Sequence, residues 1–302
     1  MRLPAPAGFR AGFACFVGRP NTGKSTLTNA LVGAKVAITS TQPQTTRHAV
    51  RGIVHRPDAQ LVIVDTPGLH KPRTLLGERL GDVVRSSLAE VDVIGFCLPA
   101  SEAVGPGDRF IAAALAELKA PVVALVTKTD LAASRDAVGE QLLAASALMD
   151  FVDVVPVSAV AGYQVDVVAD VLIAHLPESP PLYSAGELTD EPEQVMIAEL
   201  IREAALDGVR DELPHSIAVL VDDLLLHEGR GDLVDVHASL YVERESQKAI
   251  VIGAKGARLR AVGTRARAEI EALLGTRIYL DLRVKVAKDW QRDPKQLRRL
   301  GF

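Results

Sequence analysis

Residues 18–25 read GRPNTGKS, a spacing of glycines, lysine and serine that suits the binding of a polyphosphate. Glycines at both ends of such a loop let backbone N–H groups approach an anion without obstruction by side chains. Lys24 can then place a cation against the terminal phosphates, and the hydroxyl of Ser25 suits Mg²⁺. We therefore predict a nucleotide site formed by Gly18, Arg19, Pro20, Asn21, Thr22, Gly23, Lys24, Ser25 and Thr26.

A second candidate group consists of Asp65, Thr66, Pro67 and Gly68, directly after the apolar run 61–64. Asp65 at the end of a strand could hold Mg²⁺ through water. Gly68 could donate its backbone N–H to a terminal phosphate and lose that bond on hydrolysis. By itself such a tetrapeptide is an ordinary turn. Its position after a phosphate-binding loop favours a switch that responds to the nucleotide.

A third group, Thr127-Lys128-Thr129-Asp130, ends the apolar run 122–126. The carboxylate of Asp130 can accept hydrogen bonds from N1 and the amino group of guanine, whereas adenine offers no matching donors. Lys128 can lay its methylenes along the base. After the next apolar run, Ser158 and Ala159 suit a backbone contact to the guanine carbonyl. We therefore predict that the nucleotide is a guanine nucleotide.

The elements that must position these groups are short apolar runs alternating with longer helical patterns. The runs that read as buried strands are 13–17, 61–64, 91–98, 122–126 and 152–157. Such alternation predicts an α/β domain with a doubly wound, mostly parallel sheet, whose ligands bind at the carboxyl ends of the strands. We assign this domain to residues 8–176 and a polar, proline-rich linker to residues 177–192.

Residues 193–302 follow a different pattern and predict a smaller α+β domain. Two segments, 234–242 and 278–286, alternate apolar and polar residues, which indicates a sheet with one buried and one polar face. The net charge of the chain is −4, but residues 241–302 carry 15 Lys and Arg against 7 Asp and Glu. This excess of positive charge favours a polyanionic partner, although a solvated basic face is the alternative.

Within this basic region, a Gly-x-x-Gly loop lies between an apolar run and an arginine-rich helix. The loop would let a single-stranded nucleic-acid backbone approach closely. The residues that we predict to bind RNA are Gly253, Ala254, Lys255, Gly256, Arg258, Arg260, Arg283 and Lys285. For Arg265 and Arg267 a second interpretation stays open, because both could pair with Glu269 and Glu271 along the helix.

Taken together, the strings GRPNTGKST, Gln44-Thr-Thr-Arg-His48 and DTPGLH, with the C-terminal module, resemble the bacterial Era family of translation-factor-related GTPases. The resemblance covers nearly the whole chain. It implies a Mg²⁺-dependent GTPase domain that binds GTP and GDP, followed by a type II KH domain. It also implies binding near the 3′ end of small-subunit (16S) ribosomal RNA and a role in assembly of the 30S subunit. By this resemblance Thr46 is the switch threonine, so that Ser25, Thr46 and Asp65 form the metal site.

Thr127 departs from the base-reading motif of this GTPase superfamily, which is usually Asn-Lys-x-Asp. We expect a retained preference for guanine with somewhat weaker binding, and equal competition by ATP and GTP would contradict this. A neutral effect of Thr127 is the alternative.

Leu69 lies where small signalling GTPases have a water-orienting Gln, and its apolar side chain cannot polarise water. In related GTPases an Asn of the phosphate loop helps to hold K⁺ instead, and Asn21 occupies that position. We therefore expect slow, K⁺-stimulated hydrolysis with Asn21, Lys24, Thr46 and Gly68 as the catalytic residues. The alternative is that Asn21 only shapes the loop.

A third departure is Ala254, because Era proteins often have two lysines in the Gly-x-x-Gly loop. One cation fewer should weaken RNA binding modestly.

The cysteines and the apolar runs indicate in which cellular compartment the protein works. Cys15 and Cys97 lie in apolar runs, which predicts buried thiols in a reducing compartment. No apolar run reaches 18 residues and residues 1–10 lack a signal-peptide pattern, so we expect a cytoplasmic protein. We also expect a monomer. The resemblance leaves weak peripheral contact with the inner face of the membrane open. Two rival functions are a non-enzymatic RNA-binding assembly factor with a structural nucleotide site and an ATP-dependent enzyme of RNA handling.

Overall fold

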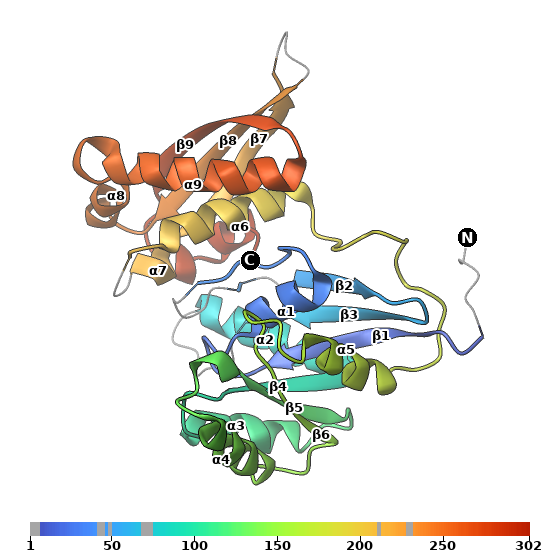
Figure 1. Cartoon of the computed structure of the whole chain (residues 1–302). Coiled ribbons are helices and arrows are strands. Elements are labelled where there is room, and N and C mark those ends of the chain that lie inside the picture. The colour runs from blue at the N-terminus through green and yellow to red at the C-terminus, as the bar shows by residue number, and fades with distance from the viewer. Residues whose placement is uncertain (1–6, 41–45, 48–49, 68–74, 210–212, 228–231) are drawn as a thin grey trace. The chain divides into compact units, whose positions relative to one another are not determined.

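The computed structural model describes residues 7–40, 46–47, 50–67, 75–209, 213–227 and 232–302. Its contacts divide the chain into two compact units (Figure 1). The first contains most of the chain up to Asp190, and the second contains Glu191–Phe302. No helix in the described part of the chain is long and apolar enough to cross a membrane.

The first unit is a six-stranded sheet in the order β2-β3-β1-β4-β5-β6. Within the described residues every neighbouring pair is parallel except β2 and β3. The strands are β1 (Arg10–Val17), β2 (Val50–His55), β3 (Ala59–Asp65), β4 (Val93–Pro99), β5 (Val122–Thr127) and β6 (Asp153–Pro156). The helices are α1 (Lys24–Val32), α2 (Leu75–Glu90), α3 (Pro106–Leu115), α4 (Arg135–Ser146) and α5 (Val165–Ala174), with a 3₁₀ turn η1 (Thr129–Leu131).

Helices cover both faces of this sheet, which is why its strands are continuous apolar runs. Alternate side chains of β1 pack on opposite faces of the sheet. Phe16 belongs to the core formed with α1 and α5, and Cys15 belongs to the core formed with α3 and α4. Cys15 and Cys97 are free and fully buried, and burial raises the pKa of each thiol to about 12. The predictions of a doubly wound, mostly parallel sheet and of buried thiols are confirmed.

Strand β2 was not predicted from the sequence. It is an antiparallel edge strand that carries exposed Arg51 and contains Gly52, so it has no clean alternation. Gly52 is required by packing, because a Cβ there would lie 2.7 Å from Cγ2 of Val32 on α1.

The proline-rich stretch 177–190 is part of the first unit and lies along its sheet. Near its start, the Ser179 N–H donates to the carbonyl of Phe9 at 3.0 Å. Further along, the N–H of Ile53 in β2 donates to the carbonyl of Leu188 at 2.9 Å, so the chain adds to the free edge of β2. At its end, Arg51 pairs with Asp190 at 2.9 Å.

Gln60 of β3 fastens the middle of this stretch. Its side-chain carbonyl accepts from the N–H groups of Leu182 (2.6 Å) and Tyr183 (2.9 Å), and its amide donates to the carbonyl of Tyr183 at 3.0 Å. The side chain is only 2% exposed, so these bonds satisfy a buried polar group.

The second unit is a three-stranded sheet in the order β7-β8-β9, with helices against one face. β7 and β8 are antiparallel, whereas β8 and β9 are parallel. The prediction of a smaller α+β domain is confirmed, and its main elements follow the order helix, two strands, two helices and strand, with four short additions. The elements are α6 (Glu193–Leu206), α7 (Leu213–Ser216), β7 (Ala218–Leu226), β8 (Leu233–Val242), α8 (Glu245–Ile252), η2 (Ala254–Gly256), α9 (Ala257–Leu274), β9 (Arg277–Val286), η3 (Trp290–Arg292) and α10 (Pro294–Arg299).

The period-two pattern gives this sheet its two faces. In β9, Ile278 and Val284 join the core formed with α6, α8 and α9, while Tyr279, Arg283 and Lys285 lie on the opposite, exposed face. Trp290 is fully buried, and its Nε1–H donates to the carbonyl of Ser216 at 3.0 Å. The one tryptophan of the chain therefore stabilises the fold and is not a stacking platform.

Replacing Gln60 should release residues 177–190 from the sheet. Gln60→Leu removes all three hydrogen bonds, and we expect amide hydrogen exchange at Leu182 and Tyr183, the two donors to Gln60, to accelerate about tenfold or more, because each such bond contributes about 1 kcal/mol. Gln60→Glu keeps the acceptor for two of the bonds and should show a smaller effect. Equal exchange rates in wild type and Gln60→Leu would contradict this role of Gln60.

Candidate nucleotide site and nucleic-acid interface

The loop between β1 and α1 wraps around the ammonium group of Lys24. Nζ donates to the carbonyls of Gly18 (3.2 Å) and Arg19 (2.9 Å), and burial lowers the pKa of Lys24. Gly18 has a φ of 154°, and a Cβ there would lie 2.7 Å from the carbonyl oxygen of Cys97. Because α1 begins at Lys24, the positive end of the helix dipole adds to this charge. The arrangement suits a polyphosphate.

The other residues of the loop have distinct surroundings. Thr22 is buried, and its hydroxyl donates to the carbonyl of Arg19 at 3.0 Å. Asn21 is exposed with a φ of 63°, Pro20 is half-buried, and Thr26 lies in the first turn of α1. The side chain of Arg19 pairs with Asp108 and Glu102.

Ser25, Thr46 and Asp65, predicted as the metal site, lie together at the carboxyl end of β3. The Ser25 hydroxyl donates to Oδ2 of Asp65 at 2.7 Å, the Thr46 hydroxyl donates to the same oxygen at 3.1 Å, and the two hydroxyls are 3.0 Å apart. Asp65 is fully buried, and its Oδ1 has no hydrogen-bond partner among the described residues. Burial raises the pKa of this carboxyl, and the hydrogen bonds from Ser25 and Thr46 oppose the rise.

This trio fits a magnesium ion. Mg²⁺ prefers oxygen ligands and commonly binds through one or two carboxylates, and the unpartnered Oδ1 of Asp65 offers a buried acceptor beside two hydroxyls. The rest of the second predicted group is only partly described. Thr66 is buried, with its hydroxyl donating to the carbonyl of Phe16 at 3.0 Å, and Pro67 is also buried. Gly68 and Leu69 lie outside the described residues.

The predicted base-reading residues line a cavity of about 110 Å³ beside the phosphate loop. The carboxylate of Asp130 is fixed by Ser158, whose hydroxyl donates to its Oδ1 at 2.6 Å. Leu131 and Val160 also line the cavity and were missed by sequence reasoning. Their exposed fractions of 61% and 81% are high for apolar side chains, and their positions beside the two motifs are the one signal that could have found them. The full lining is Gly23, Thr26, Leu27, Thr127, Lys128, Asp130, Leu131, Val157, Ala159 and Val160.

Two hydrogen bonds join this cavity to the phosphate loop. The Thr127 hydroxyl donates to the carbonyl of Thr22 at 2.6 Å, and Nζ of Lys128 donates to the carbonyl of Asn21 at 2.5 Å. Thr127 is buried at 4% exposure, so its bond to the loop is shielded from water. Thr127 therefore braces the loop although it lacks an amide.

The Gly-x-x-Gly loop of the second unit lies between α8 and α9. Gly253, Lys255 and Gly256 have φ values of 71°, 50° and 75°, and a Cβ on Gly253 would lie 2.7 Å from Cβ of Arg258. Ala254 and Lys255 are exposed. The loop thus presents backbone and one cation to solvent.

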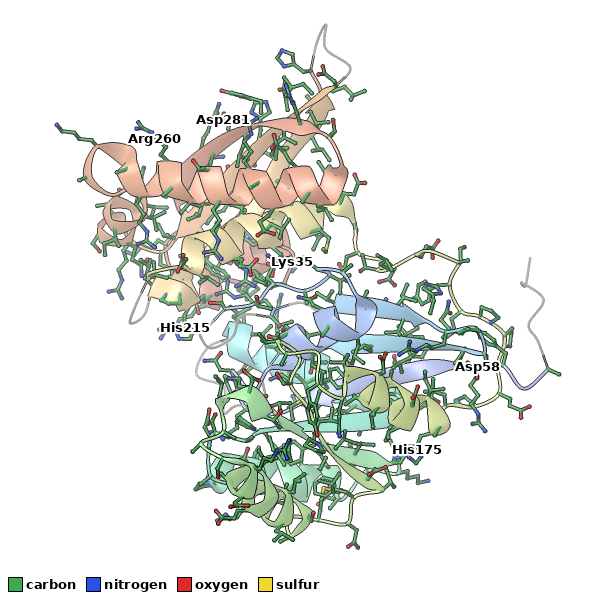
Figure 2. The ribbon with its side chains drawn as sticks, in the orientation of Figure 1. Lys35, Asp58, His175, His215, Arg260 and Asp281 are labelled. Carbon is green, nitrogen blue, oxygen red and sulfur yellow. The ribbon has the colours of Figure 1, made fainter. Side chains whose placement is uncertain are left out.

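The basic residues around this loop fall into two groups. Arg260 on α9 is exposed near the loop (Figure 2), and neither Arg260 nor Lys255 makes an ion pair within the described residues. Arg258 instead donates to carbonyls at the end of α6, including that of Asp207 at 2.6 Å. Of the two residues left open above, Arg267 pairs with Glu271 at 2.9 Å and Arg265 with Asp207 at 2.6 Å.

Arg283 and Lys285 are not brought together with this loop. Both lie on the open face of the sheet, opposite the helices, where Arg283 pairs with Asp281 at 2.8 Å and Lys285 is 3.8 Å from Asp222. The predicted RNA-binding residues therefore occupy two faces of the second unit.

Comparison with known proteins assigns both units. Residues 13–128 match the family described as 50S ribosome-binding GTPase, and residues 212–291 match the KH domain. The first unit is thus a phosphate-loop GTPase domain and the second a KH domain.

Whole-chain relatives narrow this class further. The chain is 68% identical to GTPase Era of Streptomyces coelicolor, covering 99% of this chain and 97% of the relative. Two solved structures, each 36% identical, superpose with a TM-score of 0.94 and cover 97% of this chain and 99% of their own. One is Era in complex with MgGDPNP and nucleotides 1506–1542 of 16S ribosomal RNA, and the other is an Aquifex aeolicus Era variant bound to GDP·AlF₄⁻. The chain belongs to the Era family of GTPases.

Loss of the Thr127 hydroxyl should weaken nucleotide binding. Thr127→Val keeps the shape but leaves the buried carbonyl of Thr22 unpaired, so we expect the Kd for a fluorescent GDP analogue to rise about 5- to 30-fold, from a cost of about 1–2 kcal/mol. Thr127→Ser keeps a hydroxyl and should bind nearly as wild type. Similar Kd values for the valine and serine variants would show that the hydroxyl is no brace.

Proposed function

We propose that this protein is a GTP-hydrolysing switch that binds small-subunit (16S) ribosomal RNA near its 3′ end and acts in assembly of the 30S subunit. The observation that carries the proposal is a guanine-type cavity braced to a phosphate loop, in the same chain as an exposed Gly-x-x-Gly loop. The relative bound to MgGDPNP and to nucleotides 1506–1542 of 16S ribosomal RNA supports the ligand and the partner.

In GTP hydrolysis, water attacks the γ-phosphorus, and the bond between the γ-phosphorus and the oxygen that bridges it to the β-phosphate breaks. The residues of the first unit have separate roles in this reaction. Asp130 selects guanine through its two acceptor oxygens. Lys24 places its charge against the terminal phosphates, where negative charge develops. Ser25, Thr46 and Asp65 would hold Mg²⁺, which when bound neutralises charge on the phosphate oxygens.

Leu69 cannot orient or polarise water, so this part of the catalysis must come from another group. We assign this task to K⁺ held with the help of Asn21, whose exposed side chain lies in the loop beside the guanine cavity. Gly68 would contribute its backbone N–H to the same phosphate. A purely structural Asn21 is the alternative.

GTP turnover measured in K⁺ and in Na⁺, with and without an RNA that carries the 3′ end of 16S ribosomal RNA, tests this proposal. We expect slow turnover that is faster in K⁺, insensitive to competing ATP and absent in Lys24→Ala. Equal rates in the two salts would contradict the role of K⁺ and Asn21. Tight GTP binding with no turnover under any condition would favour the rival function, a non-enzymatic RNA-binding assembly factor with a structural nucleotide site.

The exposed cation of the Gly-x-x-Gly loop should contribute to RNA binding. In Lys255→Ala, we expect weaker binding of the same RNA and a plot of log Kd against log salt that is shallower by about one, because one phosphate contact is lost. Lys285→Ala, on the open face of the sheet, tests the second group of predicted RNA-binding residues in the same assay. An equal loss in the two variants would show that the open face also contacts RNA, and no loss in Lys255→Ala would contradict the role of the loop.

We further propose a monomeric, cytoplasmic protein. The weak peripheral membrane contact that the resemblance left open would rest on the basic residues of 292–299, whose charge RNA binding explains as readily. One of them, Arg299, donates to the hydroxyl of Tyr241 at 3.1 Å and so has a role within the fold.

A further inference from the structure

Arg19 ties the phosphate loop to helix α3. Its Nε donates to Oδ1 of Asp108 at 2.8 Å, and its Nη2 donates to Oε2 of Glu102 at 3.0 Å. The side chain of Asp108 is fully buried, whereas those of Arg19 and Glu102 are 29% and 48% exposed. Because a buried carboxylate without its cation is strongly destabilising, the Arg19–Asp108 pair is the firm contact and Glu102 is a minor one.

The start of α3 is built to receive this arginine. Oδ2 of Asp108 accepts from the N–H of Gly105 at 2.8 Å, which fixes the carboxylate in the first turn of the helix. At Gly107 a Cβ would lie 2.9 Å from Cδ of Arg19, so the absence of a side chain there leaves room for the arginine. Partial burial lowers the pKa of Arg19, but the hydrogen bond and charge of Asp108 more than reverse this effect and raise it.

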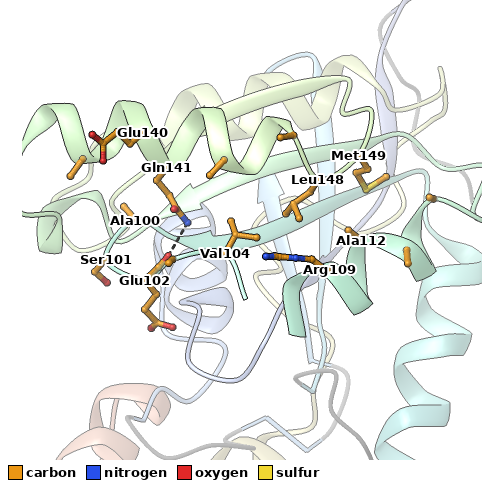
Figure 3. Close-up of a pocket in the computed structure, with 16 residues that line it drawn as sticks. Ala100, Ser101, Glu102, Val104, Arg109, Ala112, Glu140, Gln141, Leu148 and Met149 are labelled. Carbon is orange, nitrogen blue, oxygen red and sulfur yellow. Dashed lines mark hydrogen bonds between the residues drawn. The ribbon is translucent and has the colours of Figure 1, made fainter. Parts of the chain in front are cut away.

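The loop that leads into α3 is fixed from the other side by α4. The side-chain amide of Gln141 donates to the carbonyls of Pro99 (3.1 Å) and Glu102 (2.9 Å). Figure 3 shows Gln141 reaching Glu102 at the rim of an open, alanine-rich groove of about 850 Å³ between α3 and α4. Asp108 is therefore presented from a held loop and a capped helix.

The backbone of Arg19 reaches the phosphate site while its side chain is anchored on α3. Its carbonyl accepts from Nζ of Lys24 at 2.9 Å and from the hydroxyl of Thr22 at 3.0 Å. A change in the anchoring of Arg19 would therefore move an acceptor that orients the ammonium of Lys24.

We propose that Asp108 is a positioning residue for GTP binding and hydrolysis, which acts through Arg19 to set the orientation of Lys24 against the terminal phosphates. The inference rests on the proposed function of Lys24. Asp108 acts indirectly, so its removal should weaken nucleotide binding less than removal of Lys24 does. The effect of removing Asp108 should also depend on the presence of Lys24.

A double-mutant cycle tests this dependence. Asp108→Asn removes the charge but leaves an oxygen for the N–H of Gly105, and we expect about tenfold weaker binding of a fluorescent GDP analogue and about tenfold lower kcat for GTP. In a Lys24→Met background the same substitution should change the Kd by less than about twofold. Asp166→Asn, which alters the exposed pair of Arg56 and Asp166, is the matched control and should leave both quantities unchanged.

The outcome that would overturn the proposal is a loss in Asp108→Asn of equal size with and without Lys24, or a loss no larger than that of Asp166→Asn. If Asp108→Asn does not fold, Arg19→Lys and Arg19→Met give the same comparison. Lysine can still pair with Asp108, so binding should fall in the order wild type, Arg19→Lys, Arg19→Met, and equal binding by the two variants would overturn the proposal. The Kd measurements remain decisive even if the wild-type protein fails to hydrolyse GTP, which separates this inference from the proposed function.

Discussion

The structure of the first unit depends on one buried cation. Lys24 is 7% exposed, and an ammonium group in that position must find acceptors that water would otherwise supply. It finds them in the carbonyls of Gly18 and Arg19, which requires the loop to close around it. The strands set that closure, since β1 and β3 end side by side and place the loop next to Asp65. When a nucleotide binds, its phosphates would complete a site that is already arranged around positive charge.

The closed loop also restricts the residue types at positions in and around it. Gly18 cannot carry a Cβ, Thr22 must satisfy its hydroxyl within the loop, and Thr127 supplies the donor for the buried carbonyl of Thr22. A threonine therefore serves where the base-reading motif of this superfamily usually has an asparagine, because the geometry needs a donor at that point and a hydroxyl provides one. The bond joins the base cavity to the phosphate loop without the amide.

Sequence reasoning identified the fold class and the groups of residues brought together at Lys24, Asp65 and Asp130, because their spacing is local and their strands are continuous apolar runs. It did not find β2, whose apolar pattern is interrupted by Arg51 and Gly52 at the edge of the sheet. The sequence also could not predict the partners of the Arg19 side chain, or that the basic residues of the second unit lie on two of its faces. A guanidinium beside a phosphate loop looks like a phosphate ligand until Asp108, far away in sequence, is placed beside it. The pairing of Arg283 with Asp281 and of Arg267 with Glu271 likewise depends on side-chain direction, which composition does not report.

Residues 177–190 extend the first unit beyond its last helix. A sheet edge such as that of β2 offers unpaired N–H and C=O groups to any other strand, and proteins commonly protect such edges. Here the chain protects the edge with its own downstream segment, through the bond from Ile53 to Leu188 and through Gln60. A fragment that stopped at the last helix of the sheet would expose this edge to strands of other copies, so the proline-rich segment covers the edge of the GTPase domain as well as connecting it to the KH domain.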